Sequence, residues 1–393
     1  RLLVRRKLAS VGDVWPIDER AGRRPEGWPG WPEGNQFALV LTHDVESRRG
    51  LEKVLPLAQI EKEMGFRSCF NFVGRDYPVY DQIRKTLADM GFEVGVHGLT
   101  HKGNLFRSRR VFDRQKDAIN QILKDWKAVG FRTPSMYHNL DWIGELDIAY
   151  DMSTFDTDPF EPQPDAVQTI FPFWFQSRSG KGFVELPNTL PQDHTLFIIM
   201  NQKDISIWKQ KLDWIAQKGG MALLNVHPDY LTFDDQPLNA SQYPIRFYED
   251  FLNQVKNDYE GRYWKPLPKE IARFWSKWDN NESKENKFPS EKITAATNKR
   301  QTPAERKEKE YKKNELDFKP QRVCFIYYAW FKGSAVLYRE AKALKDRGFN
   351  VDIICLRDSK SAPKSWEYEG LKIYGIQAPS QKRQLRYWLY VAP

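Results

Sequence analysis

The chain has 393 residues, of which 40% are hydrophobic and 14% aromatic, so it can bury a sizeable core and is not disordered throughout. Its net charge of +9 is spread along the sequence among many acidic residues, and no zinc-finger, helix-turn-helix or RNA-recognition pattern is present, which argues against a nucleic-acid partner. No stretch approaches the roughly 18 apolar residues of a membrane span.

Residues 1–36 are basic and then rich in Trp, Pro and Gly, which indicates a segment packed around something else rather than a domain. From Phe37 onward, apolar runs typical of strands alternate with amphipathic patterns typical of helices. The predicted strands cover residues 37–42, 68–74, 92–98, 129–134, 194–200 and 221–227, and the predicted helices cover 51–65, 80–91, 108–130 and 205–220. This alternation predicts an α/β fold with a parallel sheet or barrel over residues 37–279, interrupted by long loops at 156–193.

The composition changes again in the last third of the chain. Residues 280–320 carry few apolar side chains and many charges of both signs, which predicts a linker. A new strand–helix–strand pattern follows at 322–329, 335–348 and 350–357, so residues 321–393 form the start of another α/β domain. Three cysteines, Cys69, Cys324 and Cys355, lie in apolar surroundings and indicate a reducing, cytoplasmic compartment.

Several predicted strands end in side chains that bind metals or transfer protons. The first strand ends in "THDVE", with Asp44 and Glu46, and the third is followed by "HGLTH", with His97 and His101. A spacing of four residues lets two imidazoles bind one ion, although it also fits two structural histidines. Because the carboxyl ends of barrel strands meet at one face, these side chains are expected to lie close together with His227, which ends "LLNVH".

The ordered set "THDVE", "HGLTH", "RTP", "FDTD" and "LLNVH" resembles the motifs of the NodB-type polysaccharide deacetylases, carbohydrate esterase family 4. The resemblance covers about residues 37–270. It implies a distorted (β/α)7 barrel that removes acetyl groups from sugars with a divalent metal, usually Zn²⁺.

The resemblance also implies roles for individual residues. Asp44 matches the general base, and His97 and His101 match two metal ligands. The family's common motif has a second aspartate directly after the base, but this chain has Val45 there, so Glu46 is expected to be the third ligand. Residues two apart in a strand share a face, so Asp44 and Glu46 can enter one site.

The remaining motifs supply the groups around the base and the acid. Arg132 matches the arginine that pairs with the base, and His227 matches the general acid. Asp156, with Asp158 as a substitute, is expected to orient His227, and His43 is expected to pack beside the site.

A second resemblance concerns the C-terminal part. "RVCFIYYAWFKGSAVLYREAKALKDRGFNVDIICLR" resembles the first βαβ unit of a family 4 glycosyltransferase of the GT-B fold. The nucleotide-sugar half of such an enzyme is absent from these residues, so transferase activity is not expected to reside in them.

The leading functional hypothesis is a metal-dependent hydrolase of carbon–nitrogen bonds that deacetylates N-acetylated, or O-acetylated, sugars in polysaccharide metabolism. Its partners would be an acetylated sugar or oligosaccharide, with no nucleic acid and no integral membrane segment, in the cytoplasm or at the inner face of the membrane. Two alternatives stay open: a hydrolase of small linear or cyclic amides on the same barrel, and a non-catalytic glycan-binding relic that has lost its metal.

Overall fold

The computed structural model divides the chain into two compact units, residues 1–287 and residues 288–393. The structure describes residues 7–8, 10–163, 165–233, 239–285, 322–327, 341–342, 345, 350–356, 363–368 and 370–376. Residues 280–285 of the predicted linker continue helix α9, Pro268–Glu285. The rest of that linker, and most of the helix predicted at 335–348, lie outside the described residues.

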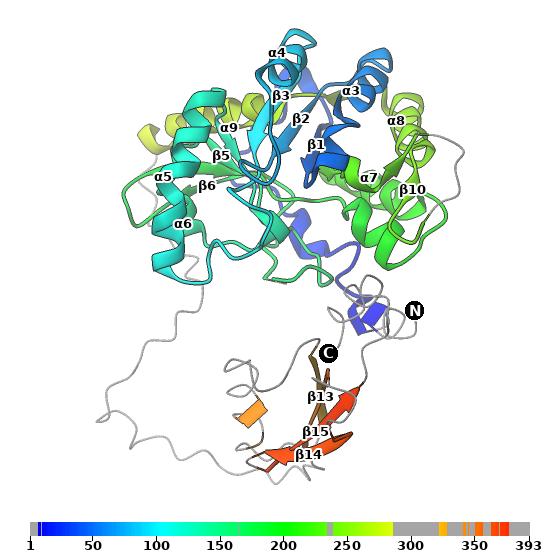
Figure 1. Cartoon of the computed structure of the whole chain (residues 1–393). Helices are drawn as coiled ribbons and strands as arrows, with labels where there is room; N and C mark the ends of the chain where they lie inside the picture. Colours follow the sequence, from blue (N-terminus) through cyan, green and yellow to red (C-terminus); the bar gives the residue numbers. More distant parts are fainter. Residues whose placement is uncertain are drawn as a thin grey trace, which may run out of the picture. The chain divides into compact units, whose positions relative to one another are not determined.

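A curved, mostly parallel sheet forms the centre of the first unit (Figure 1). Its strands follow the order β11-β1-β2-β3-β4-β5-β7-β6, and β8 also pairs with β1. The pair β6–β7 is antiparallel, and the other pairs of this sheet are parallel. The strands are β1 Phe37–Val45, β2 Ser68–Phe72, β3 Glu93–Val96, β4 Gly130–Phe131, β5 Tyr150–Asp151, β6 Phe173–Gln176, β7 Gly182–Glu185, β8 Met221–Asn225 and β11 Tyr263–Trp264. The predicted α/β barrel is confirmed.

Strand β1 lies at the middle of this sheet, and all nine of its residues are buried. Leu41 pairs with Ser68 of β2 on one edge, and Ala38 pairs with Met221 of β8 on the other. A parallel strand that is covered on both faces needs apolar side chains on both, which explains the continuous run "FALVL".

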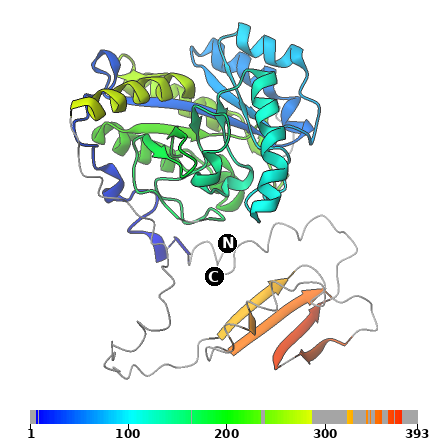
Figure 2. The ribbon, with the colours of Figure 1, turned by 90° about the vertical axis from the view of Figure 1, so that its left-hand side faces the viewer.

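Helices cover the outer side of the sheet (Figures 1 and 2). They are α3 Val54–Glu63, α4 Asp81–Asp89, α5 Arg109–Trp126, α7 Ser206–Lys218, α8 Arg246–Tyr259 and α9. Two single-turn helices, α2 Arg48–Leu51 and α6 Leu140–Ile143, lie in the connections after β1 and β4. Local capping sets the ends of α5. Ser108 accepts a hydrogen bond from the amide of Val111 at its start, and Lys127 takes a left-handed φ of 53° at its end. The helix therefore stops before Gly130, which had been predicted to end it and instead begins β4.

The barrel is closed by an irregular segment, residues 186–193 after β7, rather than by a further strand; we call it the closing segment. The amide of Leu190 donates to the carbonyl of Leu223 in β8 at 3.0 Å, and the amide of Met221 donates to the carbonyl of Ile170 at 2.8 Å. The predicted loops at 156–193 thus contain the hairpin β6–β7 and this closing segment.

One predicted strand is wrong. Residues His194–Ile199 form a short helix of the wide π type, η4, at whose start the Asp193 side chain accepts a hydrogen bond from the amide of His194. Their apolar run "LFII" buries Leu196 and Phe197 in the core from a helix. A short apolar run does not distinguish a strand from a buried helical turn.

The aromatic residues of the N-terminal segment pack into the first unit. Trp28 lies 5.0 Å from Trp275 and 5.9 Å from Phe274 of α9, measured between ring centroids. The indole of Trp31 donates a hydrogen bond to the carbonyl of Gly219 at 2.9 Å. Figure 2 shows this blue segment beside α9. These loop aromatics therefore contribute to the core.

The second unit contains a small sheet of order β12-β13-β15-β14. Its strands are β12 Arg322–Tyr327, β13 Asn350–Leu356, β14 Ser365–Tyr368 and β15 Leu371–Ile376. The pairs β12–β13 and β13–β15 are parallel, and Val351, Ile353 and Leu371 are buried in one cluster with Ala341. Among the described residues of the whole chain, no helix is long and apolar enough to cross a membrane.

Candidate active site

The candidate site lies at the carboxyl ends of the strands of the first unit. Asp44 is the penultimate residue of β1, and Glu46 follows that strand. His97 follows β3, Arg132 follows β4 and His227 follows β8. Parallel strands carry their carboxyl ends to one face, so these five side chains meet although they are up to 183 positions apart in sequence.

Glu46, His97 and His101 form a group that can bind a metal ion. One ligand atom from each lies within 4.8 Å of those of the other two. Glu46 Oε1 is 3.1 Å from His101 Nε2, close to the roughly 3.4 Å expected between two atoms that each lie about 2.1 Å from one tetrahedral ion. His101 Nε2 is buried, and Glu46, its nearest charged neighbour, raises the pKa of this imidazole. An imidazole nitrogen and a carboxylate oxygen at this separation can pair with each other or bind one ion between them.

The third residue of this group, His97, is oriented by the backbone. Its Nδ1 lies 3.1 Å from the carbonyl oxygen of Arg132. A carbonyl can only accept, so Nδ1 carries the proton and Nε2 keeps the lone pair that a metal needs. Burial lowers the pKa of His97 to about 4, so this imidazole is neutral at pH 7. Two histidines and one carboxylate are a donor set typical of a hydrolytic Zn²⁺ site.

Asp44 is a buried carboxylate held from three sides. Its Oδ1 accepts from Arg132 Nη1 at 3.2 Å and from Asn71 Nδ2 at 3.0 Å, and its Oδ2 accepts from Asn225 Nδ2 at 2.8 Å. Burial raises the pKa of this carboxyl, but the Arg132 guanidinium and the neighbouring imidazoles outweigh that effect and hold the pKa well below its usual range. Arg132 and Asp44 therefore form a buried ion pair, and Asp44 is an ionised carboxylate fixed in place.

His227 is oriented by Asp193, and the prediction that Asp156 or Asp158 does so is wrong. His227 Nδ1 lies 2.6 Å from Asp193 Oδ1, and the backbone amide of His227 donates to Asp193 Oδ2 at 2.8 Å. Asp156 instead pairs with buried Lys211 at 2.6 Å. Asp158 Oδ1 accepts from the amide of Phe160, so it closes its own turn.

The physical reason lies in the closing segment of the barrel. Asp193 ends the segment that runs alongside β8, so it lies level with His227, which follows β8. The charge of this pair decides the protonation of His227. Burial lowers the pKa of the imidazole, but Asp193 and the more distant carboxylates of Glu46 and Asp44 raise it to about 10. His227 is therefore an imidazolium at neutral pH and can donate a proton.

His43 was expected beside the site, but it lies on the opposite face of β1. Successive side chains of a strand alternate, so Asp44 faces the barrel interior and His43 faces the helices. Its Nε2 lies 2.8 Å from Glu61 of α3, and its Nδ1 lies 3.0 Å from the carbonyl of Val226. Glu61 also accepts from Ser68 at 2.6 Å and from the hydroxyl of Tyr248. This polar network ties α3 and α8 to β1.

Sequence reasoning missed the amides that hold the charged groups. Asn71 and Asn225 bind Asp44, and Asn188 Oδ1 accepts from Arg132 Nη2 at 3.1 Å. A signal existed for the first two, because each is a lone polar residue inside an apolar strand, in "CFNFV" and "LLNVH". Asn188 and Asp193 had no such signal, since they lie in a segment without regular periodicity.

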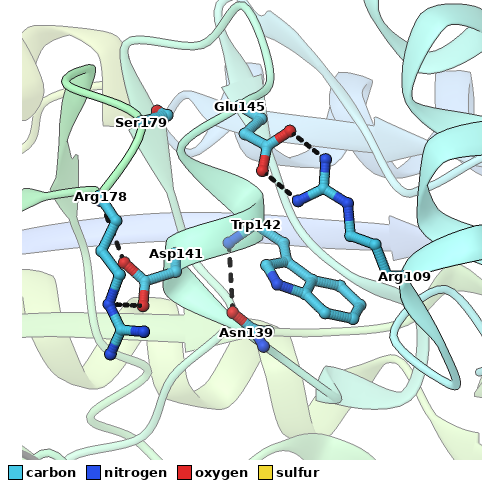
Figure 3. A pocket seen from close by; sticks show the side chains of 7 residues that line it. All are labelled: Arg109, Asn139, Asp141, Trp142, Glu145, Arg178 and Ser179. Atoms are coloured by element: carbon cyan, nitrogen blue, oxygen red, sulfur yellow. Dashed lines mark hydrogen bonds and ion pairs between the residues drawn. The ribbon is translucent and has the colours of Figure 1, made fainter.

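A separate surface pocket of about 480 Å³ lies beside α6 (Figure 3). Its charged side chains are already paired. Arg109 donates to both oxygens of Glu145, and Arg178 pairs with Asp141 at 3.1 Å around the indole of Trp142. None of its lining residues belongs to the metal group or to the Asp44 and His227 environments. The chemistry described above is thus independent of this pocket.

Comparison with solved structures gives the same fold for the first unit. A protein assigned as a polysaccharide deacetylase from Mycobacterium smegmatis matches with a TM-score of 0.50 and 18% identity, over 65% of this chain and 96% of that one. The PuuE allantoinase and a protein assigned as a polysaccharide deacetylase from Pseudomonas aeruginosa PAO1 each match with a TM-score of 0.50 and 15% identity, over 67% of this chain and 98% of theirs.

These likenesses define the fold class. The first unit has the curled α/β barrel of the NodB-like deacetylase structures, with the metal-type residues at the carboxyl ends of its strands. At 15–18% identity, the likeness concerns the fold alone. No protein-family model matches the sequence, and no curated protein sequence matches it.

Proposed function

We propose that the first unit is a metal-dependent deacetylase of acetylated sugars. The observation that carries this proposal is the juxtaposition of a three-residue metal group with an ionised carboxylate and an imidazolium. His227 Nε2 is 3.7 Å from Glu46 Oε1, and Asp44 Oδ1 is 3.9 Å from His97 Nδ1, so the acid and the base both border the metal group. A base and an acid whose neighbours drive their pKa values in opposite directions are what amide hydrolysis requires.

The residues divide the reaction between them. A divalent metal, most suitably Zn²⁺, held by Glu46, His97 and His101 would polarise the acetyl carbonyl and acidify a water molecule. Asp44 accepts a proton from the attacking water, and Arg132 keeps that carboxylate in place. His227 donates its proton to the leaving nitrogen or oxygen as the bond to the acetyl carbon breaks, which releases acetate and the free amine or alcohol.

Acetate release tests this proposal directly. We expect purified protein to retain a divalent metal and to release acetate from N-acetylated oligosaccharides, such as short chitin fragments. Stripping with a chelator should abolish release, and adding Zn²⁺ should restore it. A protein that binds no metal and releases no acetate from N- or O-acetylated sugars would support the glycan-binding relic instead.

The Asp193–His227 pair allows a prediction with a matched control. Asp193→Asn should lower kcat at least about 10²-fold, because the imidazole loses the group that fixes its orientation and charge. In the native chain the pKa of His227 is raised to about 10, so the acid stays protonated across the neutral range. Without Asp193 that pKa falls, and activity should be lost at a lower pH on the alkaline side of the kcat–pH profile.

The control is Asp156→Asn, which removes a buried carboxylate that pairs with Lys211. It should lower stability while leaving the alkaline side of the profile where it was. If Asp156→Asn shifts the profile and Asp193→Asn does not, the assignment of the orienting residue is wrong.

A hydrolase of small cyclic amides is the second candidate. It is favoured by the match to the PuuE allantoinase, whose fold likeness equals that of the two deacetylase structures. The same base, acid and metal group would open a cyclic amide instead of releasing acetate. Metal retention with allantoin hydrolysis and without acetate release would favour this candidate.

The second unit fits the start of a glycosyltransferase of the GT-B fold. Its parallel pairs β12–β13 and β13–β15 agree with a βαβ unit, although the connecting residues lie largely outside the described ones. A cytoplasmic location accords with the buried thiol of Cys69, which forms no disulfide. A sugar-modifying role for both units is part of this proposal.

A further inference from the structure

We propose that Tyr230 and Asp229 are positioning residues that make Glu46 bind the metal through one oxygen only, Oε1. This inference rests on the metal group of the proposed function. In the common NodB-type motif the corresponding side chain is an aspartate at the position of Val45. Glu46 is one methylene longer, so its side chain has one more torsion angle that must be fixed before the carboxylate can bind an ion. Both positioning residues come from the short turn η5, Pro228–Tyr230, directly after His227.

Tyr230 holds the oxygen that faces away from the histidines. Its hydroxyl donates to Glu46 Oε2 at 2.9 Å. The other oxygen, Oε1, is the one that lies 3.1 Å from His101 Nε2 and 3.7 Å from His227 Nε2. The two oxygens of the Glu46 carboxylate therefore have different partners. Oε2 accepts from the hydroxyl of Tyr230, whereas Oε1 lies next to His101 and His227. Such outer partners orient ligands and tune their affinity for the ion.

Asp229 fixes the backbone that carries Glu46. Its Oδ2 accepts from the amide of Glu46 at 2.9 Å, and its Oδ1 accepts from the hydroxyl of Ser47. Asp229 is buried, and a Cβ on Gly50 would come within 2.1 Å of its Oδ2, so this close approach requires glycine. A third hydrogen bond joins the two segments, because the ammonium of Lys53 donates to the carbonyl of Leu231, the residue after η5, at 2.6 Å.

A purely structural role would predict a different result. Ser47 also caps α2, because its hydroxyl accepts from the amide of Arg49. If η5 served only to anchor α2, changes there would lower stability and leave metal coordination unaltered. If η5 positions Glu46, they would alter the coordination of the ion in a protein that is still folded.

The test uses Tyr230→Phe in the full chain, with Co²⁺ and Zn²⁺ as probes. The variant keeps the ring that packs 5.2 Å from His227 and 5.2 Å from His194 and removes only the hydroxyl. We expect metal affinity, measured by competition with a chelator, to fall about 10- to 100-fold. We also expect the visible spectrum of the Co²⁺ protein to change, because a released Oε2 can join the ion and raise its coordination number.

Tyr259→Phe is the matched control, because its hydroxyl binds Asp213 at 2.6 Å on the helical layer. It should leave both readouts unchanged. Asp229→Asn should weaken metal binding in the same direction, and circular dichroism will show whether each variant is folded. If Asp229→Asn does not fold, Tyr230→Phe still decides the question.

Two outcomes would overturn the inference, and they differ from each other. If Tyr230→Phe binds Co²⁺ as tightly as the native chain and with the same spectrum, Tyr230 does not position Glu46, although the proposed function stands. If the native chain itself binds neither Co²⁺ nor Zn²⁺, the proposed function fails and this inference fails with it.

Discussion

Replacing Asp44 with asparagine is expected to lower kcat for acetate release by roughly 10²- to 10⁴-fold while metal binding persists. The asparagine side chain has nearly the same shape, but it cannot accept the proton of the attacking water. Asp44 is not among the three residues whose ligand atoms converge, so the ion keeps its full donor set. Initial rates on N-acetylated oligosaccharides and metal content after gel filtration measure the two effects separately.

The same variant should also lose stability, because the buried guanidinium of Arg132 then lacks its charged partner. We expect a loss of about 3 kcal/mol or more in the free energy of unfolding. Rates must therefore be measured well below the melting temperature of the variant. An Asp44→Asn protein that is folded, holds metal and releases acetate at the native rate would remove Asp44 from the mechanism.

Replacing Glu46 with alanine is expected to weaken metal binding by more than about 100-fold. Loss of an outer partner alone costs about 10- to 100-fold, and Glu46 is one of the three residues whose ligand atoms converge in the described part of the chain. Acetate release should fall in parallel and should not recover at Zn²⁺ concentrations that saturate the native chain. Metal content and affinity by chelator competition measure this change.

Val45 supplies the sharper control. Placing an aspartate at position 45, as in the common NodB-type motif, in the double variant Val45→Asp and Glu46→Ala should not give metal binding, because Val45 is fully buried on the face of β1 that packs into the core. A carboxylate there is unpaired and should cost about 3 kcal/mol or more of stability. Recovery of metal binding in the double variant would mean that β1 can present position 45 to the site, contrary to the structure.

Much of the barrel could be predicted because its strands carry strong, local signals. Strand β1 is buried on both faces, which gives a continuous apolar run. Helix α5 is buried on one face, which gives an amphipathic pattern, and both patterns can be recognised in the sequence. The metal group could be predicted for the same reason. Glu46, His97 and His101 each follow a strand that is recognisable by itself, and the resemblance supplied their pairing.

The rest depended on contacts that leave no pattern. Asp193 reaches His227 only because the closing segment lies against β8, and nothing in "LPNTLPQDH" indicates that neighbour. Asp156 resembled the expected motif locally, but Lys211, 55 positions away, pairs with it. The helix at His194–Ile199 was mistaken for a strand because six apolar-rich residues satisfy both patterns.

The partners of Asp44 have a consequence for how the first unit folds. Its carboxylate is satisfied by Asn71 of β2, Arg132 after β4 and Asn225 of β8, which are spread across more than 150 positions. A chain that stops short of β8 would bury a carboxylate without its full set of donors, at a cost of desolvation. We therefore expect the barrel to form in one cooperative transition late in synthesis, with no stable half-barrel before β8 is available.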